Sequence, residues 1–171
     1  MFMYFTSGTY DFLKNIKEKH TNEQLVLLEN ENNALLIHES SGSTFFSAPR
    51  SYEIFESAGE FSEPGFAVLN NIPVTDEGRP LFEYRFKNRK GKIENETGFI
   101  GLRVLRPQKD HTYIVLTFWE DEKSFNNWQN SNSFKQAHSK PDGQKEEQSK
   151  PPQIFAGASY ITKYYRANED E

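Results

Sequence analysis

The chain has 171 residues, enough for one ordinary domain or two small ones, and carries a net charge of −5. That charge does not favour nucleic acid or anionic lipid as a partner, and the absence of cysteine excludes disulfides, thiolate catalysis and cysteine-ligated metal clusters. No apolar run approaches the ~20 residues of a membrane helix and no signal-peptide pattern is present, so we expect a cytoplasmic protein that does not enter a membrane.

The first third of the chain predicts short strands and two helices. β-prone stretches separated by polar turn clusters indicate strands at residues 2–6, 24–28, 34–38 and 43–48. Thr9 is placed to cap a helix over residues 10–19, whose apolar side chains fall on one face. Residues 51–58 repeat apolar side chains at helical spacing and stop at Gly59, which predicts a second helix.

The rest of the chain repeats that order of elements. Residues 65–74 are strongly apolar and predict a strand, and Pro80 in the first turn of an apolar repeat predicts a helix beginning near Gly78. The following elements are strands at residues 99–106, 112–119 and 158–165. A helix over residues 121–138, either continuous or broken near Ser131, precedes the last strand. Residues 139–153 hold no aliphatic or aromatic side chain, which predicts a mobile loop.

The two cycles predict an α+β fold built from two ferredoxin-like units, residues 1–62 and residues 63–171. Each unit of this kind leaves one sheet face without cover. We therefore expect the two units to pack sheet to sheet inside one chain, as in a dimeric α+β barrel. Such an internal pseudo-dimer predicts that the protein is a monomer.

The four histidines are the candidate nitrogen ligands. His20, His38 and His111 lie in turns or at a strand end, where a solvated or capping role is the simpler interpretation. His138 differs, because a helical stretch can present it to one cavity together with Trp128. A histidine beside aromatic residues is nevertheless more often a packed or surface residue than a ligand, so the pattern alone leaves both interpretations open.

Asn70 is the polar residue of an otherwise apolar strand. Alternation in the strand assigns its side chains to two faces, Phe66, Val68, Asn70 and Ile72 against Leu69 and Asn71. Both faces are apolar enough to be buried, so an amide there needs a hydrogen-bond partner or a function. Asn71, just before Ile72 and Pro73, fits a bond to a local backbone group better than Asn70 does.

Other catalytic patterns are absent from the sequence. It contains no Gly-x-Ser-x-Gly elbow, no glycine-rich phosphate loop and no His-Glu-x-x-His zinc helix. The carboxylates are scattered in charged runs such as residues 120–122, whose simplest role is solvation. No acid pair is therefore predicted.

Residues 66–140 resemble the antibiotic biosynthesis monooxygenase fold, specifically its IsdG-type haem-degrading monooxygenases. The resemblance is carried by Phe66 to Ile72, Thr117-Phe118-Trp119-Glu120, Phe125-Asn126-Asn127-Trp128 and Phe134-Lys135-Gln136-Ala137-His138. Residues 6–13 extend it to a longer form of the family, which carries its dimer-like partner in the same chain. The family uses an Asn near the end of the first strand, a Trp in the helix after the third strand and a His ten residues later. These positions correspond to Asn70, Trp128 and His138.

The resemblance implies that haem is both substrate and cofactor, opened with O2 so that iron is released. His138 would be the axial ligand of the haem iron, because a neutral imidazole suits iron and no cysteine competes for it. Asn70 would donate an amide N–H to the oxygen on the distal side, and Trp128 would press on the porphyrin and favour its distortion. No flavin or nicotinamide fingerprint is present, so electrons must come from a reductase or a small reductant.

The sequence leaves several functions and contacts open. Arg85, Lys87 and Arg89 could contact the haem propionates, although solvated helix charges are the default. Residues 8–10 and 105–107 also resemble a staphylococcal signal-transduction family; that resemblance implies a non-catalytic protein without the Asn and the Trp, so their presence here favours an enzyme. A cofactor-free monooxygenase of the same fold and a haem-binding protein without turnover also remain open.

Overall fold

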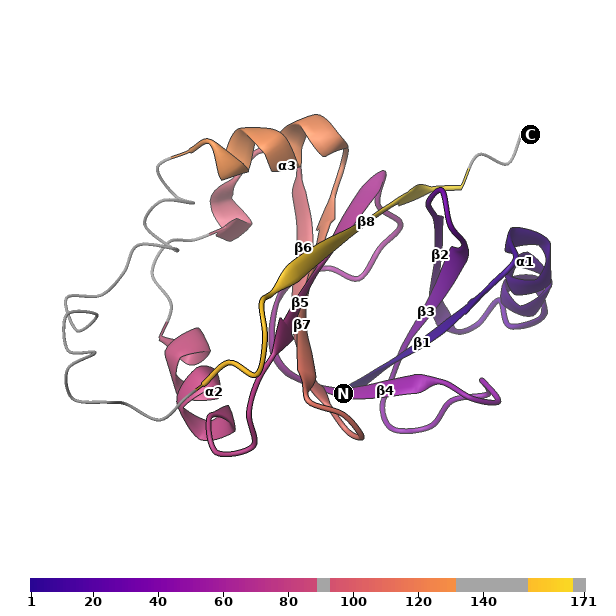
Figure 1. The fold of residues 1–171 in the computed structure, drawn as a ribbon. Coiled ribbons are helices and arrows are strands. Elements are labelled where there is room, and N and C mark those ends of the chain that lie inside the picture. The colour runs from indigo at the N-terminus through magenta and orange to yellow at the C-terminus, as the bar shows by residue number, and fades with distance from the viewer. Residues whose placement is uncertain (89–92, 132–153, 168–171) are drawn as a thin grey trace, which may run out of the picture.

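The computed structural model describes residues 1–88, 93–131 and 154–167, and within them eight antiparallel strands close into one barrel (Figure 1). The strands are β1 (Phe2–Gly8), β2 (Gln24–Glu29), β3 (Ala34–Ser40), β4 (Arg50–Gly59), β5 (Phe66–Pro73), β6 (Phe99–Pro107), β7 (Thr112–Trp119) and β8 (Tyr160–Arg166). The helices are α1 (Tyr10–Lys19), α2 (Arg79–Lys87), α3 (Glu122–Gln129) and the 3-10 turn η1 (Ile93–Asn95). None of these helices is long and apolar enough to cross a membrane.

The strand order is the same in the two halves of the chain. Around the barrel it runs β1-β3-β2-β8-β5-β7-β6-β4, so β1 to β4 follow the order β4-β1-β3-β2 and β5 to β8 follow β8-β5-β7-β6. Both are the order of a ferredoxin-like unit. The halves meet along two seams of different length, since β4 pairs with β6 from Tyr52 to Gly59 whereas β2 pairs with β8 only at Leu28 and Glu29.

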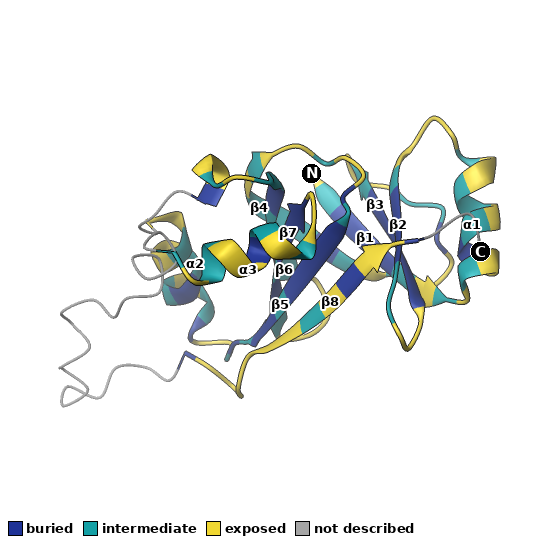
Figure 2. Ribbon diagram, turned by 90° about the horizontal axis from the view of Figure 1, so that it is seen from above, coloured by how far each residue is buried: buried dark blue, intermediate teal, exposed yellow. Residues whose placement is uncertain are grey.

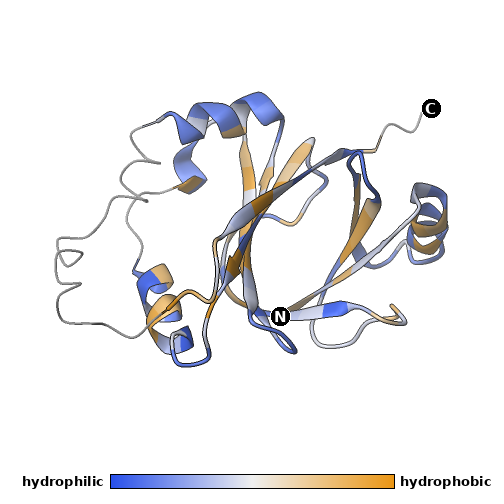
Figure 3. Ribbon diagram, viewed as in Figure 1, coloured by the Kyte–Doolittle hydropathy of each residue, from blue (hydrophilic) through white to orange (hydrophobic). Residues whose placement is uncertain are grey.

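The barrel interior is a continuous apolar core, and the helices lie outside it (Figures 1 and 3). Because side chains alternate along a strand, each strand sends every second residue inward. The inward set comes from both halves of the chain: Met3, Phe5, Val26, Leu28, Leu35, Ile37, Tyr52, Ala67, Leu69, Leu105, Ile114, Leu116, Phe118 and Tyr164. The outward faces are left for the helices to cover.

Local sequence signals explain most of the elements. Thr9 caps α1 as expected, since its Oγ1 accepts a hydrogen bond from the Phe12 N–H at 3.3 Å. Pro80 lies in the first turn of α2, where its missing N–H leaves no carbonyl unpaired. The strands predicted around residues 24–28, 34–38, 99–106 and 112–119 are confirmed to within two residues at each end.

The helix predicted over residues 51–58 is wrong, because this stretch is β4. A β-bulge between Ile54 and Glu56 adds one residue to the strand as it pairs with β6. Ile54 packs toward the barrel core and the next residue, Phe55, packs outside on Tyr113, so both sides of the strand carry apolar side chains. The resulting apolar spacing imitates a helix.

The strand predicted over residues 43–48 is also wrong. These residues form an irregular connection in which Phe45 and Phe46 pack edge to face, with ring centroids 5.2 Å apart. Phe46 is buried over the outward side of β3. Burial of an aromatic pair, rather than pairing of a strand, explains the apolar character of this stretch.

The helix predicted over residues 121–138 is confirmed only in its first part. Asp121 is the N-cap, α3 ends at Gln129, and Asn130 follows as the C-cap. His138 lies outside the described residues, as do Arg89 and the loop expected at residues 139–153.

Candidate functional site

Asn70 lies in the middle of β5 on the outward side of the barrel. Its direct neighbours across the sheet are Val115 of β7 and Ile161 of β8. Along β5, Val68 packs in the cluster under α3, and Ile72 packs in the cluster under α2. Asn70 therefore occupies the strip of sheet between the two helices. We call this surface, formed by Val68, Asn70, Ile72, Val115 and Ile161, the Asn70 face.

Trp128 covers one end of the same side of the sheet. Asp121 starts α3 by accepting the Ser124 N–H at 2.9 Å, and this hydrogen bond holds the pKa of Asp121 below its usual range. Phe125 and Trp128, three residues apart, then face Trp119 of β7, with ring centroids 5.9 and 5.8 Å away. The structure thus places Asn70 and Trp128, both singled out from the sequence, over one side of the barrel.

Asn71 is turned away from this site. Only 5% exposed, it donates from Nδ2 to the Leu69 carbonyl at 3.1 Å, and to the Tyr160 carbonyl and Thr162 Oγ1 across the strand. The expected bond to a local backbone group is confirmed. Asn71 is a satisfied buried amide, which leaves Asn70 as the amide on the outward side.

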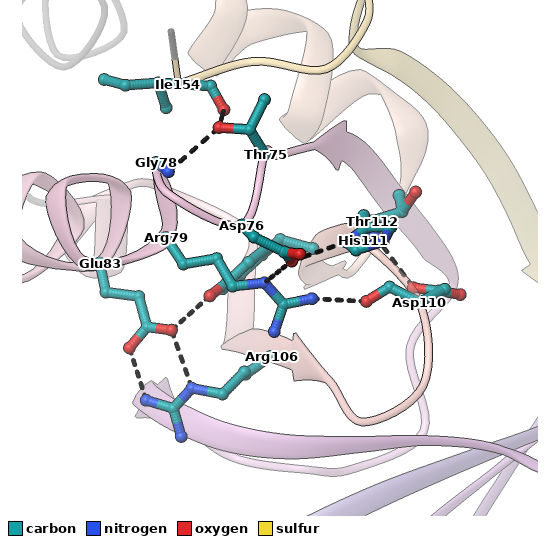
Figure 4. A network of polar contacts seen from close by, with 11 residues as sticks. Thr75, Asp76, Gly78, Arg79, Glu83, Arg106, Asp110, His111, Thr112 and Ile154 are labelled. Atoms are coloured by element: carbon teal, nitrogen blue, oxygen red, sulfur yellow. Dashed lines mark hydrogen bonds and ion pairs between the residues drawn. The ribbon is translucent and has the colours of Figure 1, made fainter. Parts of the chain in front are cut away.

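A charged clamp fastens α2 to the sheet at the other end of the Asn70 face (Figure 4). Arg106 of β6 donates from Nε and Nη2 to the two oxygens of Glu83 at 2.8 and 2.5 Å, and the Tyr113 hydroxyl also donates to Glu83. The hydrogen bond from Arg106 is the main reason that the pKa of Glu83 lies below its usual range. Burial, followed by the bond to Glu83, raises the pKa of Tyr113, so the phenol stays neutral.

The sequence did not predict this clamp. Its three residues lie on separate elements, and a carboxylate on a helix has many possible partners at that range. The one local signal is an Arg at an outward strand position, where it must find an anion or water. The clamp fixes the helix that forms one wall of the Asn70 face.

The start of α2 is also anchored to the chain that leads into β8. The Ile154 carbonyl accepts the Thr75 N–H at 2.8 Å, and Thr75 Oγ1 accepts the Gly78 N–H at 3.0 Å (Figure 4). The stretch that contains His138 leaves the described structure after Ser131, at the end of α3, and returns at Ile154, beside α2. Its two described ends therefore lie at the two helices that border the Asn70 face.

The structure corrects the expectation for His38. This histidine is only 1% exposed; its Nδ1 lies 2.9 Å from Thr44 Oγ1 and its Nε2 lies 2.7 Å from Glu23 Oε1. His20 stacks on Phe45 with ring centroids 3.7 Å apart, and His111 is exposed. Among the described residues, no three His, Asp or Glu side chains are grouped to hold a metal ion.

Two further surfaces carry charged groups. Arg85 and Lys87 lie exposed on α2, as solvated helix charges do. A cavity of about 240 Å³ opens between α1 and β2, and its lining mixes Lys17, Glu18 and His20 with two leucines.

Comparison with known proteins links the chain to two groups. Residues 65–140 match the family model of the antibiotic biosynthesis monooxygenases. Signal transduction protein TRAP of Staphylococcus aureus is 30% identical over 138 residues, which cover 81% of this chain and 83% of that protein.

Solved structures of similar proteins cover nearly all of the chain. The structure of a major regulator of staphylococcal pathogenesis superposes with a TM-score of 0.82 at 25% identity, covering 98% of this chain and 100% of that one. LmHde, a haem-degrading enzyme from Listeria monocytogenes, superposes with a TM-score of 0.69 at 20% identity, covering 98% and 100% of the two chains. At that identity the second likeness concerns the fold.

Proposed function

We propose that this chain, which belongs to the family of staphylococcal TRAP and carries an antibiotic biosynthesis monooxygenase domain, binds haem at the Asn70 face and degrades it. The observation that carries the proposal is the arrangement of Asn70 and Trp128 on one side of the barrel, where Trp128 lies partly exposed on a buried aromatic cluster. The fold shared with a haem-degrading enzyme adds support.

Each of the three site residues has a distinct role in this proposal. His138 would hold the haem iron through its imidazole nitrogen, and Asn70 would donate its amide N–H to the oxygen that haem chemistry supplies. Trp128, which packs against Trp119, would favour distortion of the porphyrin by its bulk. Haem is the substrate, O2 supplies the oxygen, and a reductase or small reductant outside the chain supplies the electrons.

The repeated strand order supports a second element of the proposal. Residues 1–62 and 63–171 form two units that imitate a dimer, with β4 and β6 on one seam and β2 and β8 on the other. Because each unit already meets its partner inside the chain, the protein acts as a monomer.

A non-catalytic signalling protein is the second candidate function. The observation that favours it is the 30% identity to staphylococcal TRAP, a signal transduction protein, over most of both chains. Under this candidate the Asn70 face would bind haem without turnover, or would bind none. Fold similarity cannot separate the two candidates, because one fold supports many functions.

Turnover of haem by the purified protein separates the candidates. Haemin is titrated in and the Soret band recorded, then ascorbate is added in air with catalase present, and released iron is trapped with a ferrous chelator. The proposal predicts a Soret band that decays with iron release in the wild type and fails to form in His138→Ala, with His111→Ala as the control. A band that survives ascorbate supports the signalling candidate, and a band unaffected by His138→Ala contradicts the proposed site.

A further inference from the structure

The residues that surround Asn70 differ sharply in exposure. Val68 and Ile72, on either side along β5, are only 3% and 8% exposed because they lie under α3 and α2. Val115, opposite on β7, is half-buried. Ile161, opposite on β8, is 47% exposed. Of these four apolar neighbours, Ile161 presents the most surface to a ligand that lies against Asn70.

The orientation of Ile161 follows from the strand pairing. Residues directly opposite in an antiparallel pair point to the same side of the sheet, so Ile161 shares the outward side with Asn70, at a Cβ separation of about 5 Å. The neighbouring pair Phe66 and Tyr165 confirms this register, because their rings pack on the outward side with centroids 5.2 Å apart. Figure 2 shows β5 buried along most of its length and β8 beside it largely exposed.

The exposure of Ile161 is not explained by the packing of the barrel. The inward side of β8 is satisfied by Tyr164, which is buried in the core. The next outward residues, Lys163 and Tyr165, reach across to Glu122 of α3, with Lys163 Nζ at 3.4 Å and the Tyr165 hydroxyl at 3.0 Å. Ile161 is thus an exposed apolar side chain beside the Asn70 amide, and the polar groups of Lys163 and Tyr165 lie on one side of it.

We propose that Ile161 is a specificity-determining residue that contacts the edge of haem bound at the Asn70 face and sets the in-plane orientation of the macrocycle. This inference rests on the proposed function. Haem has a propionate edge and an apolar edge. Rotation of haem in its own plane therefore changes whether a polar or an apolar substituent lies against a given side chain of the protein. An apolar wall at Ile161 favours the orientations that place a methyl or vinyl group there and disfavours those that place a propionate there.

The orientation decides which meso carbon lies next to Asn70. If Asn70 positions the oxygen, the carbon closest to it is the one at which the ring opens. Changing the shape or polarity of Ile161 therefore changes the ratio of product isomers, whereas a residue with a purely structural role would lower all isomers together. This difference makes the inference testable apart from overall activity.

The experiment compares Ile161→Ala and Ile161→Asp with Tyr160→Ala. Tyr160 is the matched control, because it is 57% exposed on the same strand but lies opposite Asn71, on the other side of the sheet. Circular dichroism checks that each variant is folded. Haemin affinity is measured by Soret titration, haem orientation by the proton NMR signals of the haem methyl groups, and product isomers by chromatography.

We expect Ile161→Ala to weaken haemin binding by roughly tenfold, because it removes a branched side chain that bound haem would cover, and to give more than one set of haem methyl signals. Ile161→Asp weakens binding further, and both variants change the isomer ratio, while Tyr160→Ala matches the wild type. Unchanged affinity, methyl signals and isomers in both Ile161 variants, with normal turnover, overturn the inference but leave the proposed function standing. A wild type that binds no haemin overturns both.

Discussion

The two halves of the barrel use the same strand order but cover their outward faces differently. In the N-terminal half, α1 and the connection at residues 41–49 close over the outward side of β1 and β3, burying Tyr4, Leu36 and Phe46. We call this the His38 face, after the buried histidine within it. In the C-terminal half, α2 and α3 stand at the two ends of the sheet, and Asn70 and Ile161 between them keep exposed surface.

The difference comes from the covering segments rather than from the sheet. His38 has both ring nitrogens in hydrogen-bond contact with protein groups and is packed by Phe45, whose ring centroid is 4.8 Å away. Among the residues the structure describes, no segment covers Asn70 as the connection with Phe45 covers His38. Two sheets of the same strand order thus differ in how far their outward sides are covered.

Replacing Asn70 gives the largest expected effect and tests the role of the Asn70 face. We expect Asn70→Ala to lower the rate of haem degradation by roughly 10²- to 10³-fold, because one oriented donor to a developing charge is lost. Haemin affinity should stay within a few-fold, since His138, the proposed iron ligand, is unchanged. Asn127→Ala, at an exposed position of α3, is the control. Equal turnover in Asn70→Ala and the wild type contradicts a role for this amide.

Replacing His38 tests whether the His38 face serves as core. His38→Ala leaves a cavity and removes the partner of Thr44, so we expect the free energy of unfolding to fall by about 2–3 kcal/mol. Haemin binding by the folded variant stays unchanged. Urea unfolding measures the loss, with exposed His111→Ala as a control expected to stay within about 0.5 kcal/mol. Loss of the Soret band in folded His38→Ala contradicts the comparison of the two faces.

Replacing Glu83 weakens the attachment of α2 beside the Asn70 face and adds a test by pH. At neutral pH we expect Glu83→Gln to lower the free energy of unfolding by about 1–2 kcal/mol, because Arg106 loses its bidentate partner. The pKa of Glu83 is lowered in the folded protein, so its contribution is full above the ordinary value of 4.5 and is lost as the pH falls through the folded value.

The pH dependence of urea unfolding in the two proteins checks this sign. The gap between wild type and Glu83→Gln stays constant from pH 7 down to about pH 5.5 and then narrows below pH 4.5. A gap that does not change with pH contradicts an ionised Glu83 clamp.

Replacing Lys163 gives the smallest effect. Its ion pair with Glu122 joins partly exposed groups 3.4 Å apart, so Lys163→Met should change the free energy of unfolding by less than about 1 kcal/mol. In 1 M NaCl, where such a pair is screened, the change should shrink further. A salt-independent loss above that size indicates that the border of the Asn70 face depends on packing of the lysine stem instead.

The sequence predicts the order of elements well where local signals decide it. Thr9, Pro80 and Asp121 mark helix starts through their own chemistry, and alternation in β5 places Asn70 on one side of the sheet and Asn71 on the other. The position of Asn71 just before Ile72 and Pro73 also favours its bond to a local backbone group. The partners of Asn71 on β8, the Tyr160 carbonyl and Thr162 Oγ1, are visible only in the structure.

The errors lie where distant parts of the chain decide the outcome. β4 carries apolar side chains on both of its faces and a bulge between Ile54 and Glu56, and both features depend on the neighbouring strand and on the packing outside the barrel. The burial of His38 depends on Phe45, seven residues away, and the Glu83 clamp depends on a strand 23 residues away. Such pairings are fixed by topology rather than by local pattern.

Haemin stoichiometry tests the central claim most directly, namely that the chain binds one haem at the Asn70 face and none at the His38 face. The measurement is a Soret titration of the wild type, His138→Ala and His38→Ala at matched, folded concentrations. We predict one equivalent in the wild type and in His38→Ala, and no saturable band in His138→Ala. Two equivalents in the wild type, or a band that persists in His138→Ala and disappears in His38→Ala, would contradict the claim.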